Sequence, residues 1–92
     1  MIFSKTGDLK FVSHLDLVRL FQRASRRADL PVSFTQGFSP RMKISINRAL
    51  KLGVESQSEE ATFYLERVIQ GDHFVKAINE KLPDGVRILR AD

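Results

Sequence analysis

The sequence contains no cysteine, and this absence excludes several kinds of stabilisation and chemistry. The chain itself can form no disulfide bond, no zinc site with thiolate ligands and no iron–sulfur cluster. Such a composition fits a reducing compartment, so we expect a cytoplasmic protein. Histidine is also scarce, and His73 has no partner at the spacing typical of metal ligands. We therefore expect no metal ion and no other cofactor.

Long apolar runs are missing as well. No run approaches the roughly 20 residues that a membrane-spanning helix needs, and residues 1–5 do not resemble a secretory signal. The hydrophobic share of 42% and the charged share of 28% are typical of a folded chain, which argues against disorder. We expect residues 1–92 to form one domain without a membrane contact, with a thin core because of its small size.

Positive charge is unevenly distributed. Residues 1–51 contain ten lysines and arginines and three acids, a balance of +7. Residues 52–92 contain five lysines and arginines and eight acids, a balance of −3. This asymmetry favours a polyanion as the partner of the first half, and a solvated basic face is the alternative. We interpret residues 14–43, where the arginines gather, as the binding surface.

The hydrophobic pattern predicts strands that alternate with two helices. Residues 2–5 predict a short strand, and apolar and polar residues alternate over 42–47, 61–66 and 86–88, which predicts three more. Residues 9–12 and 32–35 are further extended candidates, and residues 48–58 are interpreted as a connection.

The first helix is predicted from Ser13, which forms a capping box with Asp16, to residues 29–30 before Pro31. The second is predicted from Asp72 as N-cap to the turn at 83–85. The first helix has an apolar stripe that we expect to be buried, formed by Leu17, Leu20, Phe21, Ala24 and Ala28.

This order of elements predicts an α+β fold of the ferredoxin-like βαββαβ type. Right-handed crossovers would place both helices on one face of an antiparallel sheet and leave the other face open. The fold alone does not give the function, because it hosts many.

The strongest binding candidates are the arginines of the first helix. Arg19, Arg23 and Arg26 stand at i, i+4 and i+7, so they form an exposed ridge, with Arg27 beside it. Guanidinium groups bind phosphates through paired N–H donors. Together with Arg41 and Lys43 they predict roughly four to six phosphate contacts. The alternative is a solubilising helix face on which Asp16 pairs with Arg19.

The loop at 36–41 is the second candidate. Gly37 permits a positive φ or a close backbone approach, and Pro40 stiffens the loop. Phe38 would stack on a base if it were exposed. A core position for Phe38 is the interpretation that we favour, because small domains bury most of their aromatic rings.

Other polar residues are weaker candidates. His14, in the first turn of the basic helix, is a candidate general base for a ribose 2′-hydroxyl, although no second acid–base partner is identifiable. The acids Glu55, Glu59 and Glu60 are interpreted as a solvated loop, with a docking site for a protein as the alternative.

Several motifs resemble a bacterial family of unknown function, the radical-SAM-linked domain DUF2344. They are Phe11-Val12-Ser13-His14-Leu15-Asp16-Leu17, Arg23-Ala24-x-Arg26-Arg27-Ala28, Gln36-Gly37-Phe38-Ser39-Pro40 and Leu52-Gly53-Val54-Glu55-Ser56. The resemblance implies that members occur beside radical SAM enzymes or fused to them, and that some are associated with ribonuclease G-type proteins. It gives no catalytic residues. Without cysteine to hold an iron–sulfur cluster, this chain cannot be the radical SAM enzyme itself.

These observations lead to three hypotheses. The first is a non-catalytic RNA-binding module that presents tRNA or rRNA to a radical SAM enzyme or a ribonuclease G-type protein. The second is a protein-interaction domain that docks a radical SAM enzyme without contacting RNA. The third is a small metal-independent ribonuclease centred on His14.

Overall fold

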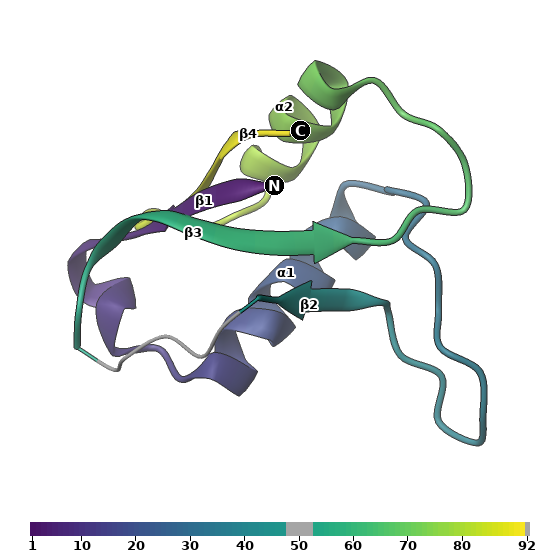
Figure 1. Cartoon of the computed structure of the whole chain (residues 1–92), viewed down its shortest axis with the longest axis horizontal. Helices are drawn as coiled ribbons and strands as arrows, with labels where there is room; N and C mark the ends of the chain where they lie inside the picture. The colour runs from purple at the N-terminus through teal and green to yellow at the C-terminus, as the bar shows by residue number, and fades with distance from the viewer. Residues whose placement is uncertain (48–52, 92) are drawn as a thin grey trace.

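The structure is a computed structural model that describes residues 1–47 and 53–91. Within these ranges the chain forms four strands and two α-helices, together with one short 3-10 helix (Figure 1). The elements are β1 (Ile2–Lys5), η1 (Gly7–Phe11), α1 (His14–Arg27), β2 (Ile44–Ile46), β3 (Ser56–Phe63), α2 (Gly71–Asn79) and β4 (Val86–Arg90).

The strands form one sheet in the order β2-β3-β1-β4, and each neighbouring pair is antiparallel. The two helical connections, β1-α1-β2 and β3-α2-β4, therefore each skip one strand, as in a split βαβ unit. This confirms the predicted α+β class and is consistent with a ferredoxin-like arrangement. No helix in the described part of the chain is both long and apolar enough to cross a membrane.

A row of phenylalanine rings shows that both helices cover the same face of the sheet. Phe3 of β1 meets Phe21 of α1 at 5.1 Å between ring centroids, and Phe21 meets Phe63 of β3 at 5.4 Å. Phe63 in turn meets Phe74 of α2 at 5.1 Å. All three contacts are edge-to-face, a geometry that contributes about 0.5–1.5 kcal/mol per pair beyond burial. The row joins the sheet to both helices.

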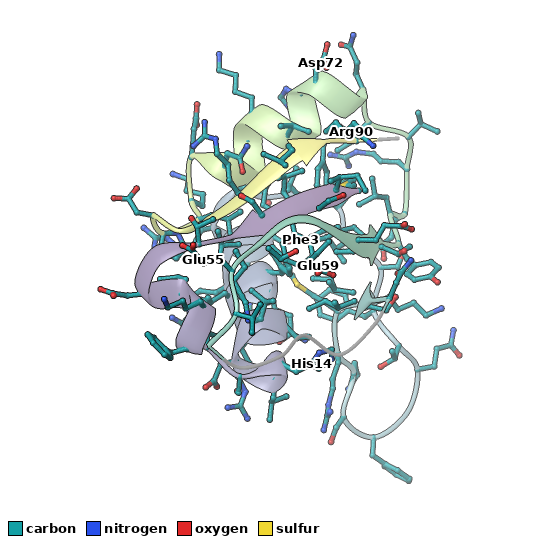
Figure 2. All side chains as sticks on the ribbon, turned by 60° about the vertical axis from the view of Figure 1, so that its left-hand side comes forward. Phe3, His14, Glu55, Glu59, Asp72 and Arg90 are labelled. Carbon is teal, nitrogen blue, oxygen red and sulfur yellow. The ribbon has the colours of Figure 1, made fainter. Side chains whose placement is uncertain are left out.

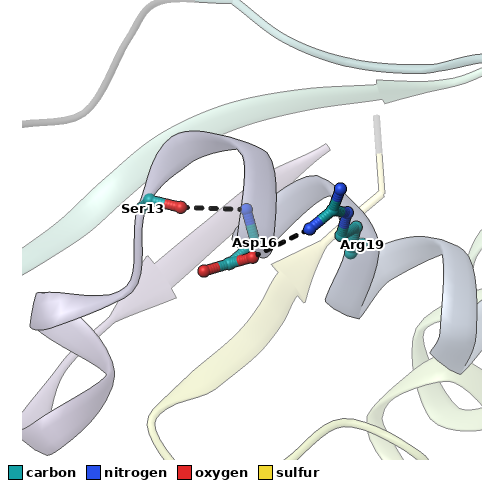
Figure 3. Close-up of polar contacts among 3 residues, drawn as sticks. All are labelled: Ser13, Asp16 and Arg19. Carbon is teal, nitrogen blue, oxygen red and sulfur yellow. Dashed lines mark hydrogen bonds and ion pairs between the residues drawn. The ribbon is translucent and has the colours of Figure 1, made fainter.

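The start of α1 follows the predicted capping box. The Ser13 hydroxyl accepts a hydrogen bond from the backbone N–H of Asp16 at 3.1 Å (Figure 3). The helix ends at Arg27, slightly before the predicted end, and Asp29 turns the chain with a φ of 56°. Leu20 and Ala28 are only half-buried, so the buried stripe is rotated from the predicted one. The residues of α1 that are buried are Leu17, Phe21, Ala24 and Ser25.

Several elements differ from the prediction in their boundaries. Residues 9–12, predicted as extended, belong mostly to η1. The strand β3 begins at Ser56, inside the segment interpreted as a connection. Gln70, not Asp72, is the N-cap of α2, and Asp72 lies in the first turn. Residues 32–35 form only two isolated bridges, Val32 with Leu65 and Phe34 with Met42.

Candidate nucleic-acid interface

A groove of about 720 Å³ lies between α1 and the segment that contains β2. It brings together three of the predicted site residues, Arg19 from the helix and Arg41 and Lys43 from the opposite wall. The remaining lining residues are Leu15, Val18, Gln22, Thr35, Met42, Ile44, Ser45 and Tyr64. The groove therefore combines three cations with apolar walls and an aromatic ring, and none of the described residues that line it is acidic.

Arg19 has one ionic partner among the described residues. Its guanidinium lies 3.4 Å from the Asp16 carboxylate (Figure 3), and the two side chains are 60% and 61% exposed. Exposed pairs of this kind contribute about 0–1 kcal/mol, because water screens them and both side chains lose freedom. Arg19 can therefore exchange this carboxylate for a phosphate at little cost.

Tyr64 lines the groove but was not among the predicted binding residues. Its ring is half-exposed at 51%, and the Lys43 ammonium lies 5.8 Å from the ring centroid. The backbone N–H of Tyr64 donates to the Lys43 carbonyl at 3.1 Å, which holds the two residues side by side. The alternation over 61–66 could have indicated this residue, because it places the Tyr64 side chain on the other face of the strand from buried Phe63.

The loop at 36–40 projects away from the body of the molecule between α1 and β2 (Figure 1). Its base is closed by Thr35, whose N–H donates to the Arg41 carbonyl at 2.7 Å and whose hydroxyl accepts from the Arg41 N–H at 3.0 Å. Gly37 has a φ of 130°, which confirms the predicted positive φ.

The core interpretation of Phe38 is wrong, because its side chain is fully exposed at 108%. The reason is the closure between Thr35 and Arg41, which holds the loop beyond the sheet and keeps its tip from reaching the core. The ring is left free to stack on a planar ligand.

The remaining arginines of α1 are exposed, but they do not share the groove. Arg23 and Arg27 line a smaller hollow of about 240 Å³ on the other side of the helix, towards the end of α2. With 3.6 residues per turn, Arg19 and Arg26 fall near the line that separates the two concavities. The predicted ridge of arginines therefore separates two concave surfaces, the groove and the smaller hollow, and each is lined by basic residues.

The weaker candidates are placed elsewhere. His14 is exposed at the first residue of α1 and does not line the groove. Within residues 1–47 and 53–91, no group of three or more histidines and acids is placed to hold a metal ion. Glu59 is buried at 5% and accepts a hydrogen bond from the Ser56 hydroxyl at 2.7 Å. In Figure 2 it lies beside its strand partner Phe3, far from His14.

The solvated-loop interpretation is therefore wrong for Glu59, because β3 begins earlier than predicted and carries it into the sheet. The other two acids of this group, Glu55 and Glu60, also have defined hydrogen-bond partners. Glu55 accepts from the backbone N–H of Gly7 at 2.7 Å, and Glu60 accepts from the Asn47 side-chain amide at 2.7 Å.

The family model for uncharacterized proteins conserved in bacteria, DUF2344, matches residues 1–92. The chain belongs to this family. The match includes all of the motifs quoted above. No curated protein and no solved structure matches the chain. A function for this DUF2344 chain therefore has to be argued from its own residues.

Proposed function

We propose that this chain is an RNA-binding module that holds single-stranded RNA in the groove between α1 and β2. The observation that carries the proposal is the convergence of Arg19, Arg41 and Lys43 around the half-exposed ring of Tyr64. Cations bind the phosphates of a flexible strand, and an exposed ring stacks on its unpaired bases. Both kinds of contact are available within one groove.

The exposed loop extends the same surface. Phe38 follows directly after Gly37, whose positive φ sets the course of the loop, and Arg41 at the base of the loop lines the groove. A strand that stacks on Tyr64 and continues towards the loop would meet a second ring. Each stacked base contributes about 1–3 kcal/mol with little sequence preference. The proposal therefore predicts tolerance of sequence rather than strict base readout.

The part of the open sheet face around Glu60 is a poorer RNA surface. Glu60 there is hydrogen-bonded to Asn47, and the Thr62 hydroxyl donates to the Asn47 side-chain carbonyl at 3.4 Å. The Glu60 carboxylate repels phosphate, and the amide of Asn47, which joins Glu60 to Thr62, is already engaged at both of its polar atoms. The groove beside α1 is the better site because its lining residues include cations and no acid.

The cellular role that we propose follows from the family resemblance. The chain would act in the cytoplasm as a non-catalytic accessory that presents tRNA or rRNA to a radical SAM enzyme or a ribonuclease G-type protein. Protein docking without RNA is the second candidate, and the observation that favours it is the apolar part of the groove, where Leu15 is 54% exposed.

A salt series with fluorescently labelled single-stranded RNA tests the proposal. We expect binding at low salt, with a log–log slope of about −2 for three phosphate contacts at −0.7 each. The variant Arg41→Glu/Lys43→Glu should lose at least tenfold in affinity. The matched control Arg67→Glu/Lys76→Glu reverses two charges away from the groove and should change binding less than twofold.

The absence of RNA binding by the unmodified chain at low salt would refute the proposal. A partner protein that stays bound after nuclease treatment and in high salt, and is released by Leu15→Glu, would favour protein docking instead.

A further inference from the structure

We infer that the hollow between α1 and the end of α2 is a second anion site, which takes a phosphate monoester. The inference deepens the proposed function, on which it rests, by naming the phosphorylated end of an RNA strand as the ligand. Its cations are Arg23 and Arg27 from α1 and Lys81 from the turn after α2. Lys81 was not among the predicted binding residues.

The charged side chains that line this hollow are of one sign. Its other lining residues, Leu20, Ala24, Leu82 and Pro83, are apolar, so none of the described residues that line it is acidic. Within the described ranges, none of the three cations has an acidic side chain at salt-bridge distance. The nearby acid Glu80 lines a different groove, on the β4 side of α2. Three positive charges therefore meet at one place without a counter-charge of their own.

The three side chains suit a phosphate group in chemistry as well as in charge. Arg23 and Arg27 stand at i and i+4, so they are neighbours on the helix surface. Guanidinium groups bind phosphate oxygens in pairs of N–H donors, and Lys81 adds a compact third charge. The volume of about 240 Å³ fits a phosphate with part of a sugar, not a length of strand.

The net charge distinguishes a monoester from a diester. The carboxyl-terminal ends of α1 and α2 lie at this hollow, and each contributes about −0.5 of a charge. The three cations contribute +3, so the net charge at the hollow is about +2. A phosphate monoester carries about −1.5 to −2 at pH 7, whereas each diester along a strand carries −1. The hollow therefore matches a strand end better than a strand interior.

Two RNA oligonucleotides of the same sequence test the inference, one with a 5′-phosphate and one with a 5′-hydroxyl. We expect the chain to bind the phosphorylated form five- to tenfold more tightly. In the variant Arg27→Gln/Lys81→Gln this preference should vanish while binding of the 5′-hydroxyl form stays the same. A third oligonucleotide with a 3′-phosphate shows which end of the strand the site takes.

Titration with inorganic phosphate, followed by NMR of the backbone amides, provides a readout that does not depend on RNA. Saturable shifts should concentrate at residues 20–27, 81 and 82 and should be absent from the variant, whose folding is checked by its thermal unfolding. If RNA binds without any preference for a terminal phosphate and inorganic phosphate causes no such shifts, the site is refuted and the proposed function stands. If no RNA binds but the shifts are found, the proposed function falls and the anion site stands.

Discussion

The side-chain amide of Asn79 pairs with both backbone groups of Ile88. The amide nitrogen donates to the Ile88 carbonyl at 2.8 Å, and the amide oxygen accepts from the Ile88 N–H at 2.8 Å. Asn79 is the last residue of α2, and Ile88 lies in the edge strand β4. The side chain thus takes the place that a further strand would occupy. Covering an edge in this way prevents other chains from pairing with it.

Replacing Asn79 by alanine should destabilise the fold. The change leaves two backbone groups of Ile88 without their partner, and each unsatisfied buried group costs about 1–3 kcal/mol. We expect a loss of at least 1 kcal/mol in the free energy of urea unfolding. The neighbouring change Glu80→Ala, at an exposed position, should stay within about 0.5 kcal/mol. Equal stability of the two variants would contradict this role of Asn79.

Removing the N-cap of α1 should also destabilise the protein. In Ser13→Ala the N–H of Asp16 loses its acceptor, and caps of this type contribute about 1 kcal/mol. Urea unfolding measures the loss, and Ser39→Ala in the exposed loop is the matched control. An unchanged unfolding midpoint in Ser13→Ala would mean that another group or water caps the helix.

Phe38→Ala should weaken RNA binding without changing the stability of the fold. The ring is fully exposed, so its removal should change the free energy of unfolding by less than about 0.5 kcal/mol. If the ring stacks on a base, RNA affinity should fall by about fivefold or more. Phe11→Ala removes another exposed ring, one that lies outside both the groove and the loop at 36–40, and should leave RNA affinity unchanged. A clear loss of stability in Phe38→Ala would argue for a structural role.

Removing the charge of Asp16 should strengthen RNA binding. In Asp16→Asn, Arg19 loses its ionic partner and a negative charge beside the groove disappears. We expect RNA affinity to rise about two- to fivefold at low salt and this gain to shrink as salt screens the charges. The free energy of unfolding should fall by about 0.3–1 kcal/mol, since the acid favours the helix start.

The control for this prediction is Asp72→Asn, which removes an acid from the first turn of α2 instead. It should cost similar stability without changing RNA affinity. Weaker RNA binding by Asp16→Asn would show that the carboxylate positions Arg19 rather than competing with the ligand.

The fold was predictable because its signals are local. Alternating residues marked most strands, and the Ser13 cap marked the start of α1. The early part of β3 was missed because residues 56–60 are polar and carry no alternation. It becomes strand because β1 pairs with it, Phe3 opposite Glu59 and Ile2 opposite Glu60.

The candidate site was only partly predictable. Arg19, Arg41 and Lys43 were selected by charge, and the structure brings them into one groove. Phe38 was predicted to be in the core because its side chain is hydrophobic. Hydrophobicity alone does not show that the hydrogen bonds between Thr35 and Arg41 hold the loop away from the core. Lys81 was missed because it is far from Arg27 in sequence, and only the packing of the two helix ends brings them together.

The central position of β1 has a consequence for how the protein is made. Of the four strands of the sheet β1 is synthesised first, yet both of its neighbours, β3 and β4, come from the second half of residues 1–92. Ile2 and Phe3 therefore stay unpaired until residues near 60 have been synthesised, and their second partner strand is complete only when residues near 90 follow. Pairings between distant segments slow folding and leave apolar strands exposed in the meantime. Nascent chains that stop before β4 should therefore expose one edge of β1 and bind chaperones more than the chain that includes β4.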